Sequence, residues 1–333
     1  MKKKVRIEEV AKAAGVSPTT VSRVINRVPT VKESNRIKVE EAIRKLKFRP
    51  DAVAQRLAKG TCDAIGLIIP RYEGIFFSFY ANQIIRGVGM TADSLKMDLL
   101  LHLSDGKNPI NLSSVGGVLF ADIISNKSEL DNVLNSGLPC VVMNYHLDEN
   151  PQVSYIAINN KMGAIQATDY LISLGHRKIA HITGDLMTQA ACERLRGYQT
   201  SLERQNIEIN SNYIVEANYS RPSAREAMTK LLRLPNPPTA VFIASDDMAQ
   251  EAIAVIIENK LNVPTDISVV GFDDNPICVF GPVALTTIRQ PLIEMAHEAT
   301  VLLHQMITSK ESISPKRVLL PAELVIRDSC RQI

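Results

Sequence analysis

The residues best suited to chemistry near the N-terminus are Thr19, Ser22, Arg23 and Asn26, which follow Pro18 in one short stretch. Their hydroxyl, guanidinium and amide groups are those that contact DNA phosphates and the base edges of the major groove. The spacing turns all five residues outward from a predicted helix. An ordinary helical hairpin in a larger core is the commoner explanation of such a stretch, so the neighbouring segments must decide.

Two short helices position these side chains. Residues 7–14 repeat apolar side chains at helical spacing, and Gly15 supplies the left-handed conformation that a tight turn needs. Ser17 can cap a second helix, with Pro18 at its tolerated first position. The buried side of that helix is formed by Val21, Val24 and Ile25. Helices joined in this way form a helix-turn-helix.

The charge distribution favours DNA as the partner. Residues 1–60 contain 16 Lys and Arg against 6 Asp and Glu, whereas the remaining chain contains 22 against 29. The net charge of +3 therefore hides a basic module on a mildly acidic body. Basic side chains near phosphates release counterions and supply affinity that does not depend on sequence.

A third helix is predicted at 33–46, and Phe48-Arg49-Pro50 ends it, because proline cannot continue a helix. Its inward residues are Val39, Ala42, Ile43 and Leu46. We therefore place a helix-turn-helix DNA-binding head at 1–49. Residues 50–60 follow as a hinge, with Asp51 as a helix cap and Gly60 as a stop. The hinge is too short to be a stable helix alone, so we expect it to be helical only when docked.

Composition excludes several classes of protein. The chain has 333 residues and no apolar run long enough to cross a membrane. It begins Met-Lys-Lys-Lys without the apolar region of a signal peptide, so we expect a cytoplasmic location. The five cysteines are odd in number and never form a C-x-x-C pair, which favours reduced packing thiols over metal or redox sites.

From Ala64 onward, short apolar runs alternate with amphipathic stretches, and the cycle restarts after Ile158. This alternation predicts parallel sheets with helices on both faces. We therefore expect residues 61–333 to form an effector-binding and dimerisation domain of two α/β lobes. Lobe 1 would comprise 61–158 with a C-terminal return at 291–333, and lobe 2 would comprise 159–290.

Polar residues follow the predicted strands, where ligands bind in open parallel sheets. They are Arg71-Tyr72, Asp122, Asn144, Gly184-Asp185, Ser245-Asp246 and Asp273-Asp274. As a set they suit a polyhydroxylated or heterocyclic small molecule between the lobes, although loop or cap roles explain any one of them better. Enzyme motifs are absent from the sequence, so neither catalysis nor a cofactor is expected. The pair His176 and His181 fits cap and strand-end positions better than a metal site.

The order of these parts resembles the lactose-repressor/galactose-repressor (LacI/GalR) family of bacterial transcription regulators. The most specific stretch is I-E-E-V-A-K-A-A-G-V-S-P-T-T-V-S-R-V-I-N, followed by F-R-P-D-A-V-A-Q-R-L. Later matches include L-G-H-R-K-I-A-H-I-T-G, R-L-R-G-Y, A-S-D-D-M-A, P-T-D-I-S-V-V-G-F-D-D and A-L-T-T-I-R-Q-P. The resemblance covers nearly the whole chain. It implies a small all-α helix-turn-helix head and an α/β body like a periplasmic sugar-binding protein, with two parallel-sheet lobes.

The resemblance also implies roles for individual residues. Pro18, Thr19 and Arg23 fall on base-reading positions, and Leu57 matches a linker leucine that wedges into the minor groove. The other expected DNA contacts are Ile7, Ser17, Thr20, Ser22, Asn26 and Ala54. Arg194 and Asp273 match the principal effector contacts, and Tyr80 and Ser245 match pocket-lining positions more weakly. A homodimer on a pseudo-palindromic operator is implied as well.

The sequence departs from the family at two places in the first lobe. About a dozen residues are missing after Leu103, where the family has a helix, and the stretch R-Y-E-G-I-F-F-S before Tyr80 carries a few extra residues. Pro18 offers no donor at its base-reading position, so Thr19 and Arg23 would carry more of the specificity. The chain has no leucine heptad tail, which favours a dimer over a tetramer.

The sequence therefore predicts a DNA-binding transcriptional regulator, specifically a repressor, controlled by a sugar or related metabolite. Two alternatives remain open at this point. One is control by a protein co-repressor, against which the presence of both Arg194 and Asp273 argues. The other is a sugar-binding transport protein, against which the basic head argues.

Overall fold

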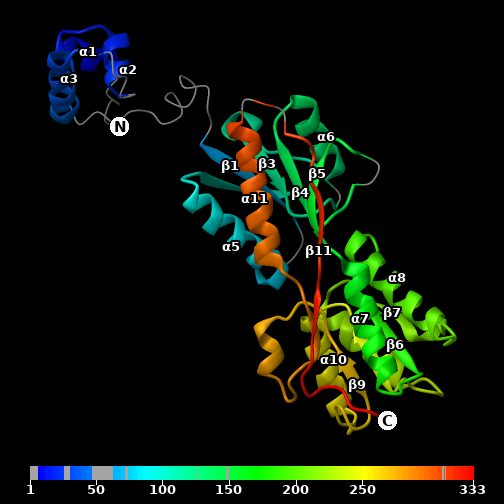
Figure 1. Ribbon diagram of the computed structural model, residues 1–333. Helices are drawn as coiled ribbons and strands as arrows, with labels where there is room; N and C mark the ends of the chain where they lie inside the picture. Colours follow the sequence, from blue (N-terminus) through cyan, green and yellow to red (C-terminus); the bar gives the residue numbers. More distant parts are fainter. Residues whose placement is uncertain are drawn as a thin grey trace. The chain divides into compact units, whose positions relative to one another are not determined.

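The computed structural model describes residues 7–25, 31–46, 63–71, 74–124, 126–147, 150–309, 311 and 313–333 (Figure 1). The chain divides into two compact units, Met1–Asp63 and Ala64–Ile333, and each is described by itself below. The predicted hinge at 50–60 lies outside the described residues.

The first unit contains three helices, α1 (Ile7–Ala14), α2 (Pro18–Ile25) and α3 (Glu33–Leu46). Gly15 joins the first two with a φ of +65°, in the left-handed region expected for this turn. Their small core consists of Val10, Ala11, Ala14, Val21, Val24, Val39 and Ala42. The predicted helix-turn-helix and its third helix are confirmed. Their apolar residues recur at helical spacing, so each helix has one face to bury.

The first lobe of the body contains a six-stranded parallel sheet in the order β11-β5-β4-β3-β1-β2. The strands are β1 (Ala64–Pro70), β2 (Asp98–Ser104), β3 (Gly117–Phe120), β4 (Cys140–Met143), β5 (Ser154–Ile158) and β11 (Arg317–Leu320). Its helices are α5 (Phe79–Ser94), α6 (Lys127–Ser136) and α11 (Leu292–Thr308), with a 3-10 turn η1 (Ile75–Phe77) before α5. Helices α5 and α11 pack together on one face of the sheet, and α6 covers the other face.

The second lobe contains a four-stranded parallel sheet in the order β7-β6-β8-β9. The strands are β6 (Ile179–Thr183), β7 (Ile214–Glu216), β8 (Ala240–Ile243) and β9 (Ser268–Val270). The helices α7 (Asn160–Ser173) and α8 (Gln189–Arg204) cover one face, and α9 (Arg221–Leu232) and α10 (Asp246–Glu258) cover the other. The prediction of two parallel-sheet lobes is confirmed.

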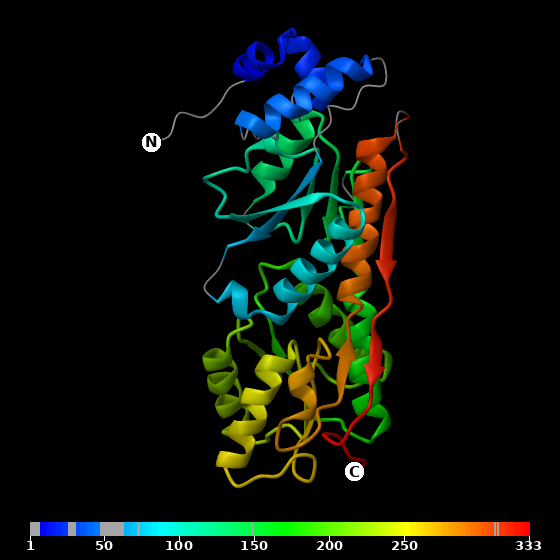
Figure 2. The same ribbon diagram turned by 90° about the vertical axis from the view of Figure 1, so that its left-hand side faces the viewer.

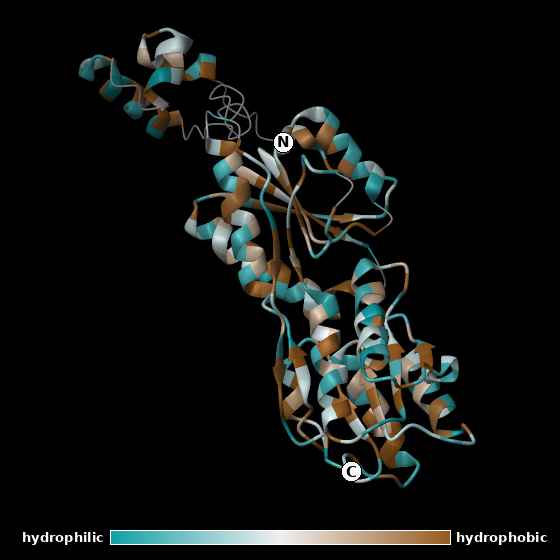
Figure 3. Cartoon of the chain, turned by 45° about the vertical axis from the view of Figure 1, so that its right-hand side comes forward, coloured by the Kyte–Doolittle hydropathy of each residue, from teal (hydrophilic) through white to brown (hydrophobic). Residues whose placement is uncertain are grey.

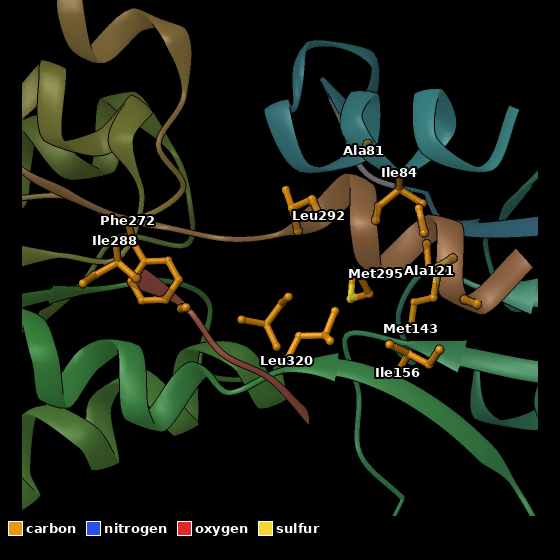
Figure 4. Packing of buried hydrophobic residues seen from close by; sticks show 14 of the residues in the cluster. Ala81, Ile84, Ala121, Met143, Ile156, Phe272, Ile288, Leu292, Met295 and Leu320 are labelled. Carbon is orange, nitrogen blue, oxygen red and sulfur yellow. The ribbon is translucent and has the colours of Figure 1, made fainter. Parts of the chain in front are cut away.

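One hydrophobic core runs through both lobes. In Figure 4, Ile84, Met143 and Met295 belong to the first lobe, whereas Phe272 and Ile288 belong to the second. The strands β1, β3, β4, β5, β6, β8 and β9 are buried along their whole length, so they appear as continuous hydrophobic runs within more polar helices (Figure 3). Because the lobes share packed side chains, a ligand held between them can influence both.

The C-terminal segment contributes to both lobes. Helix α11 and strand β11 return to the first lobe, and β12 (Glu323–Val325) pairs antiparallel with β10 (Thr287–Arg289). The chain then runs along the second lobe (Figure 2), where Val269 N donates to Ser329 O at 2.8 Å and Ile333 N donates to Leu174 O at 3.0 Å. The sequence assigned all of 291–333 to the first lobe. The difference arises because pairing between distant strands has no local sequence signal.

The connection between β2 and β3 contains only the 3-10 turn η2 (Leu112–Ser114). The expected loss of an α-helix after Leu103 is therefore confirmed. Ile110 and Val115 of this connection pack onto the sheet in place of a helix. The buried Glu129 carboxylate of α6 fixes it by accepting hydrogen bonds from Ser104 Oγ at 2.5 Å and Ile110 N at 2.9 Å.

Candidate functional sites of the head and the body

Helix α2 presents a polar face away from the small core of the head. Pro18, Thr19 and Arg23 are exposed, while Val21 and Val24 are buried beneath them. Thr19 and Arg23 are four residues apart, so they lie on the same side of the helix. This arrangement presents a hydroxyl in the first turn of the helix and a guanidinium in its last turn, on one exposed face. In helix-turn-helix proteins the second helix reads base edges in this way.

Ser17 begins this helix as predicted. Its Oγ accepts a hydrogen bond from Thr20 N at 3.1 Å and lies 2.9 Å from Thr20 Oγ1. Both hydroxyls are therefore committed to the cap in this structure. Ile7 packs against the core of the head, and Ser22 is half-buried. The predicted contacts Asn26, Ala54 and Leu57 lie outside the described residues.

In the body, Arg194 of α8 is held between the two sheets' strand ends. It is 4% exposed, its guanidinium carbon lies 3.7 Å from the centroid of the Phe272 ring, and Nε donates to Asn160 Oδ1 at 2.9 Å. Nη1 donates to Ala244 O. The stacking and the two hydrogen bonds fix the plane of the guanidinium before any ligand arrives, which is what precise recognition requires.

Asp273 follows β9 and lies within electrostatic range of Arg194. Its Oδ1 accepts a hydrogen bond from Gln290 Nε2 at 2.6 Å. Burial, reinforced by the neighbouring Asp246 carboxylate, raises the pKa of Asp273 well above its ordinary value, and Arg194 acts in the opposite direction. A ligand that donates hydrogen bonds to this carboxylate would stabilise its ionised form.

The first lobe contributes a second buried carboxyl group, Asp122, at the end of β3. Burial raises its pKa to about 7, and the opposing effect of hydrogen bonds from Ile123 and Asn144 is smaller. Tyr80 of α5 lies beside it and donates its hydroxyl proton to Ala121 O. The structure therefore brings together Asp122, Asn144 and Tyr80, all of which the sequence singled out.

Tyr219 was missed by the sequence analysis. It follows β7 in a left-handed conformation, with a φ of +55°, and its ring lies over Gly184. The Arg194 guanidinium carbon lies 6.0 Å from the centroid of this ring. Burial of the hydroxyl raises the pKa of Tyr219 although 37% of the residue is exposed, and Arg194 acts in the opposite direction. The Asp273 and Asp122 carboxylates also raise this pKa, so the hydroxyl lies near carboxylates of both lobes. No residue type or spacing marks a loop tyrosine for such a position.

Other residues predicted from strand ends have structural roles. Asp274 accepts hydrogen bonds from Arg289 and Arg327, and Asp246 accepts them from Thr287 Oγ1 at 2.6 Å and Asn275 N at 2.8 Å. Ser245 caps α10 by accepting a hydrogen bond from Met248 N. Of the residue pair Arg71-Tyr72, Tyr72 lies outside the described residues.

The histidines of the second lobe are part of its core. His181 stacks on Phe242 with ring centroids 4.5 Å apart, and burial lowers its pKa to about 4. His176 hydrogen-bonds to Thr239 and Ser268, which joins three segments of the chain. Within the described ranges, no three His, Cys, Asp or Glu side chains gather as a metal site would need.

No helix in the described part of the chain has the length and hydropathy needed to cross a membrane. Two family models match the chain. Residues 6–51 match the bacterial regulatory proteins of the lacI family, and residues 168–330 match a periplasmic binding protein-like domain.

Curated relatives match over nearly the full length. The probable HTH-type transcriptional repressor ExuR of Bacillus subtilis (strain 168) is 34% identical, covering 99% of both chains. Catabolite control protein A of Priestia megaterium is 32% identical, covering 98% of this chain and 99% of its own.

Two solved structures are similar over the same length. The lac repressor dimer bound to operator and an anti-inducer has a TM-score of 0.83 at 27% identity, covering 99% of this chain and 100% of its own. The CelR–cellobiose complex has a TM-score of 0.73 at 30% identity, covering 98% and 99%. The described head and two-lobed body therefore match whole regulators, and the chain belongs to the LacI family of bacterial regulatory proteins.

Proposed function

We propose that this chain is a sequence-specific transcriptional repressor that binds operator DNA as a homodimer. The observation that carries the proposal is the exposed face of α2, where Thr19 and Arg23 stand clear of the core on a stably capped helix. The basic charge of residues 1–60 supplies the complementary attraction to phosphates. The operator-bound lac repressor dimer, to which the chain is similar, supports the same reading.

We propose further that a small neutral effector rich in hydroxyl groups binds between the lobes. Arg194 supplies donors, whereas Asp122 and Asp273 supply acceptors from opposite lobes. Two carboxyl groups beside one guanidinium offer acceptors and donors to the ligand, which favours a polyol such as a sugar. The similarity to a cellobiose complex supports a sugar-like effector.

Binding to operator and binding to effector can be tested separately. The full chain should bind a DNA fragment selected from a random library, with an affinity that falls steeply as salt rises. A panel of sugars, sugar acids and nucleobases should contain a neutral polyol that raises the melting temperature of the protein. A sugar acid that stabilises the protein more than every neutral polyol would contradict the assigned effector class.

A further inference from the structure

The two lobes are joined at a hinge made of three chain crossings. Within the described part of the body, the chain passes between the lobes at 158–160, 289–292 and 320–323. Asn159 N donates to Leu320 O at 2.9 Å, which ties the first crossing to the third. Strands β10 and β12 pair where the second and third crossings meet the second lobe. The crossings therefore form one hinge, about which the lobes can turn.

A side-chain contact joins the lobes at another place. Gln189 is the first residue of α8 in the second lobe, and His146 follows β4 in the first. Gln189 Oε1 accepts a hydrogen bond from His146 N at 2.8 Å, and Gln189 Nε2 donates one to His146 O at 3.1 Å. One side chain thus pairs with both polar backbone groups of a single residue. Glutamine can do so because it carries an acceptor and donors together, whereas an ionised carboxylate has no donor.

Both ends of this contact are held within their own lobes. In the second lobe, Thr188 caps α8 by accepting a hydrogen bond from Ala191 N at 3.2 Å, and its hydroxyl donates to Asp185 O at 2.7 Å. In the first lobe, the His146 ring packs near the Tyr155 ring of β5, with centroids 6.3 Å apart. Hydrogen bonds weaken steeply as their distance and angle change. The two bonds between these fixed ends therefore favour one relative position of the lobes.

The contact borders open space rather than packed apolar side chains. A cavity of about 220 Å³ is lined by Gln189 and His146, and also by Asn159 and Leu319 at the hinge. The contact can therefore break without disturbing the hydrophobic core. Gln189 also stands on the same helix as Arg194, so an effector held by Arg194 acts on the helix that carries the contact.

We propose that Gln189 is a positioning residue: its contact with His146 is a latch that holds the lobes in the arrangement described here, and operator affinity depends on whether this latch is closed. The second part rests on the proposed function, whereas the first does not. Each hydrogen bond has a modest net strength, so the two together should favour the latched arrangement about 5- to 30-fold. A preference of this size lies within the range that allosteric ligands shift, about 5- to 150-fold.

Three variants of the full chain separate latching from a role in stability alone. Gln189→Met keeps the length of the side chain and removes both hydrogen bonds. Gln189→Glu keeps the acceptor for His146 N but turns a carboxylate toward His146 O, and a negative charge is favourable at the start of a helix. The melting temperature of Gln189→Glu should therefore stay close to that of wild type. Gln205→Met, the matched control, makes the first substitution at an exposed position just beyond the other end of α8.

Fluorescence energy transfer between labels on the exposed Asn132 of α6 and Lys230 of α9 reports the separation of the lobes. The labels are carried by noncanonical amino acids, and excess unlabelled chain leaves one labelled subunit in each dimer. Both Gln189 variants should shift or broaden the distance distribution, and Gln205→Met should match wild type. Amide exchange at His146 should accelerate about 5- to 30-fold in Gln189→Met. It should change little in Gln189→Glu, because the carboxylate still accepts this proton.

The latch is overturned if the lobe separation in Gln189→Met matches wild type, even where His146 exchanges faster, because the contact would then act only locally. Operator affinity without effector, measured on the same samples, tests the regulatory part, and we expect Gln189→Met to change it by up to about 5- to 30-fold. An unchanged affinity in a variant with shifted lobes would overturn that part. If wild type binds no operator, the repressor function fails, and the distance measurement still decides the latch.

Discussion

At the scale of single residues, Arg23 is the most informative side chain of the head. It is exposed on α2, four residues after Thr19, where a guanidinium can bridge guanine O6 and N7. We expect Arg23→Ala to lose about 1–3 kcal/mol of binding free energy on the cognate operator and little on random DNA. Lys38→Ala, which removes an exposed charge from α3, is the matched control in fluorescence anisotropy. Equal losses on both DNAs would make Arg23 a phosphate contact.

Asp122 gives a residue-scale prediction about pH. Because burial raises its pKa to about 7, the folded protein holds a proton that the unfolded chain releases near its ordinary pKa of 3.8. The stabilising contribution is therefore present below about pH 4 and is lost as the pH rises toward 7. We expect Asp122→Asn to remove this loss, worth on the order of 2–4 kcal/mol at pH 8.

The measurement is the difference in unfolding free energy between wild type and Asp122→Asn at pH 5 and at pH 8. Taking this difference cancels the titration of other groups. The amide still accepts the hydrogen bond that Ile123 N makes at 2.6 Å, so the local geometry is preserved. A difference that stays constant between the two pH values would show that Asp122 is already ionised at pH 5.

At the scale of elements, the shortened connection between β2 and β3 depends on Glu129. Ser104 Oγ and Ile110 N both donate to its carboxylate, and His102 Nε2 lies 3.4 Å away. Glu129→Ala leaves these buried donors unsatisfied, so we expect it to destabilise the body by about 2–4 kcal/mol. Asp131→Ala on the exposed side of the same helix should change the denaturation midpoint only slightly. Comparable shifts in both variants would mean that the connection is fixed by apolar packing alone.

The elements themselves could be predicted because each leaves a local pattern. Helical spacing predicted α1, α2 and α3, and the apolar runs of the parallel strands predicted β1 to β9. The pairing of β11 with β5 and of β12 with β10 could not be predicted in the same way. These pairs join residues far apart in sequence, and their register follows from the packed structure rather than from neighbouring residues.

The residues of the proposed effector site could likewise be predicted from the sequence only in part. Arg194 and Asp273 stand in motifs that the sequence displays, and Asp122 follows an apolar run. Tyr219 could not be found, since only the fold brings its loop against Gly184 and near carboxylates of both lobes. Asp274, although next to Asp273, turns to Arg289 and Arg327 instead. Adjacent residues with identical chemistry therefore differ in role because the backbone directs them apart.

At the scale of the whole molecule, regulation requires the effector to prefer one arrangement of the lobes over another. An effector with equal affinity for both arrangements leaves their populations unchanged. Asp122 belongs to the first lobe, whereas Arg194 and Asp273 belong to the second, so a ligand that contacts all three depends on how the lobes meet. A coupling of about 1–3 kcal/mol would change operator affinity roughly 5–150-fold.

We expect Asp273→Ala to abolish this response while leaving operator affinity without effector nearly unchanged. The carboxylate lies in the body and, among the described residues, supports only Gln290 within hydrogen-bond distance. Asp169→Ala removes an exposed carboxylate from α7 of the same lobe and should respond like wild type. Operator affinity with and without the effector, measured for all three proteins, decides the question. A mutant that still responds at the wild-type effector concentration would place the effector away from Asp273, because losing a half-buried carboxylate that hydrogen-bonds to the ligand cannot leave the ligand's affinity unchanged.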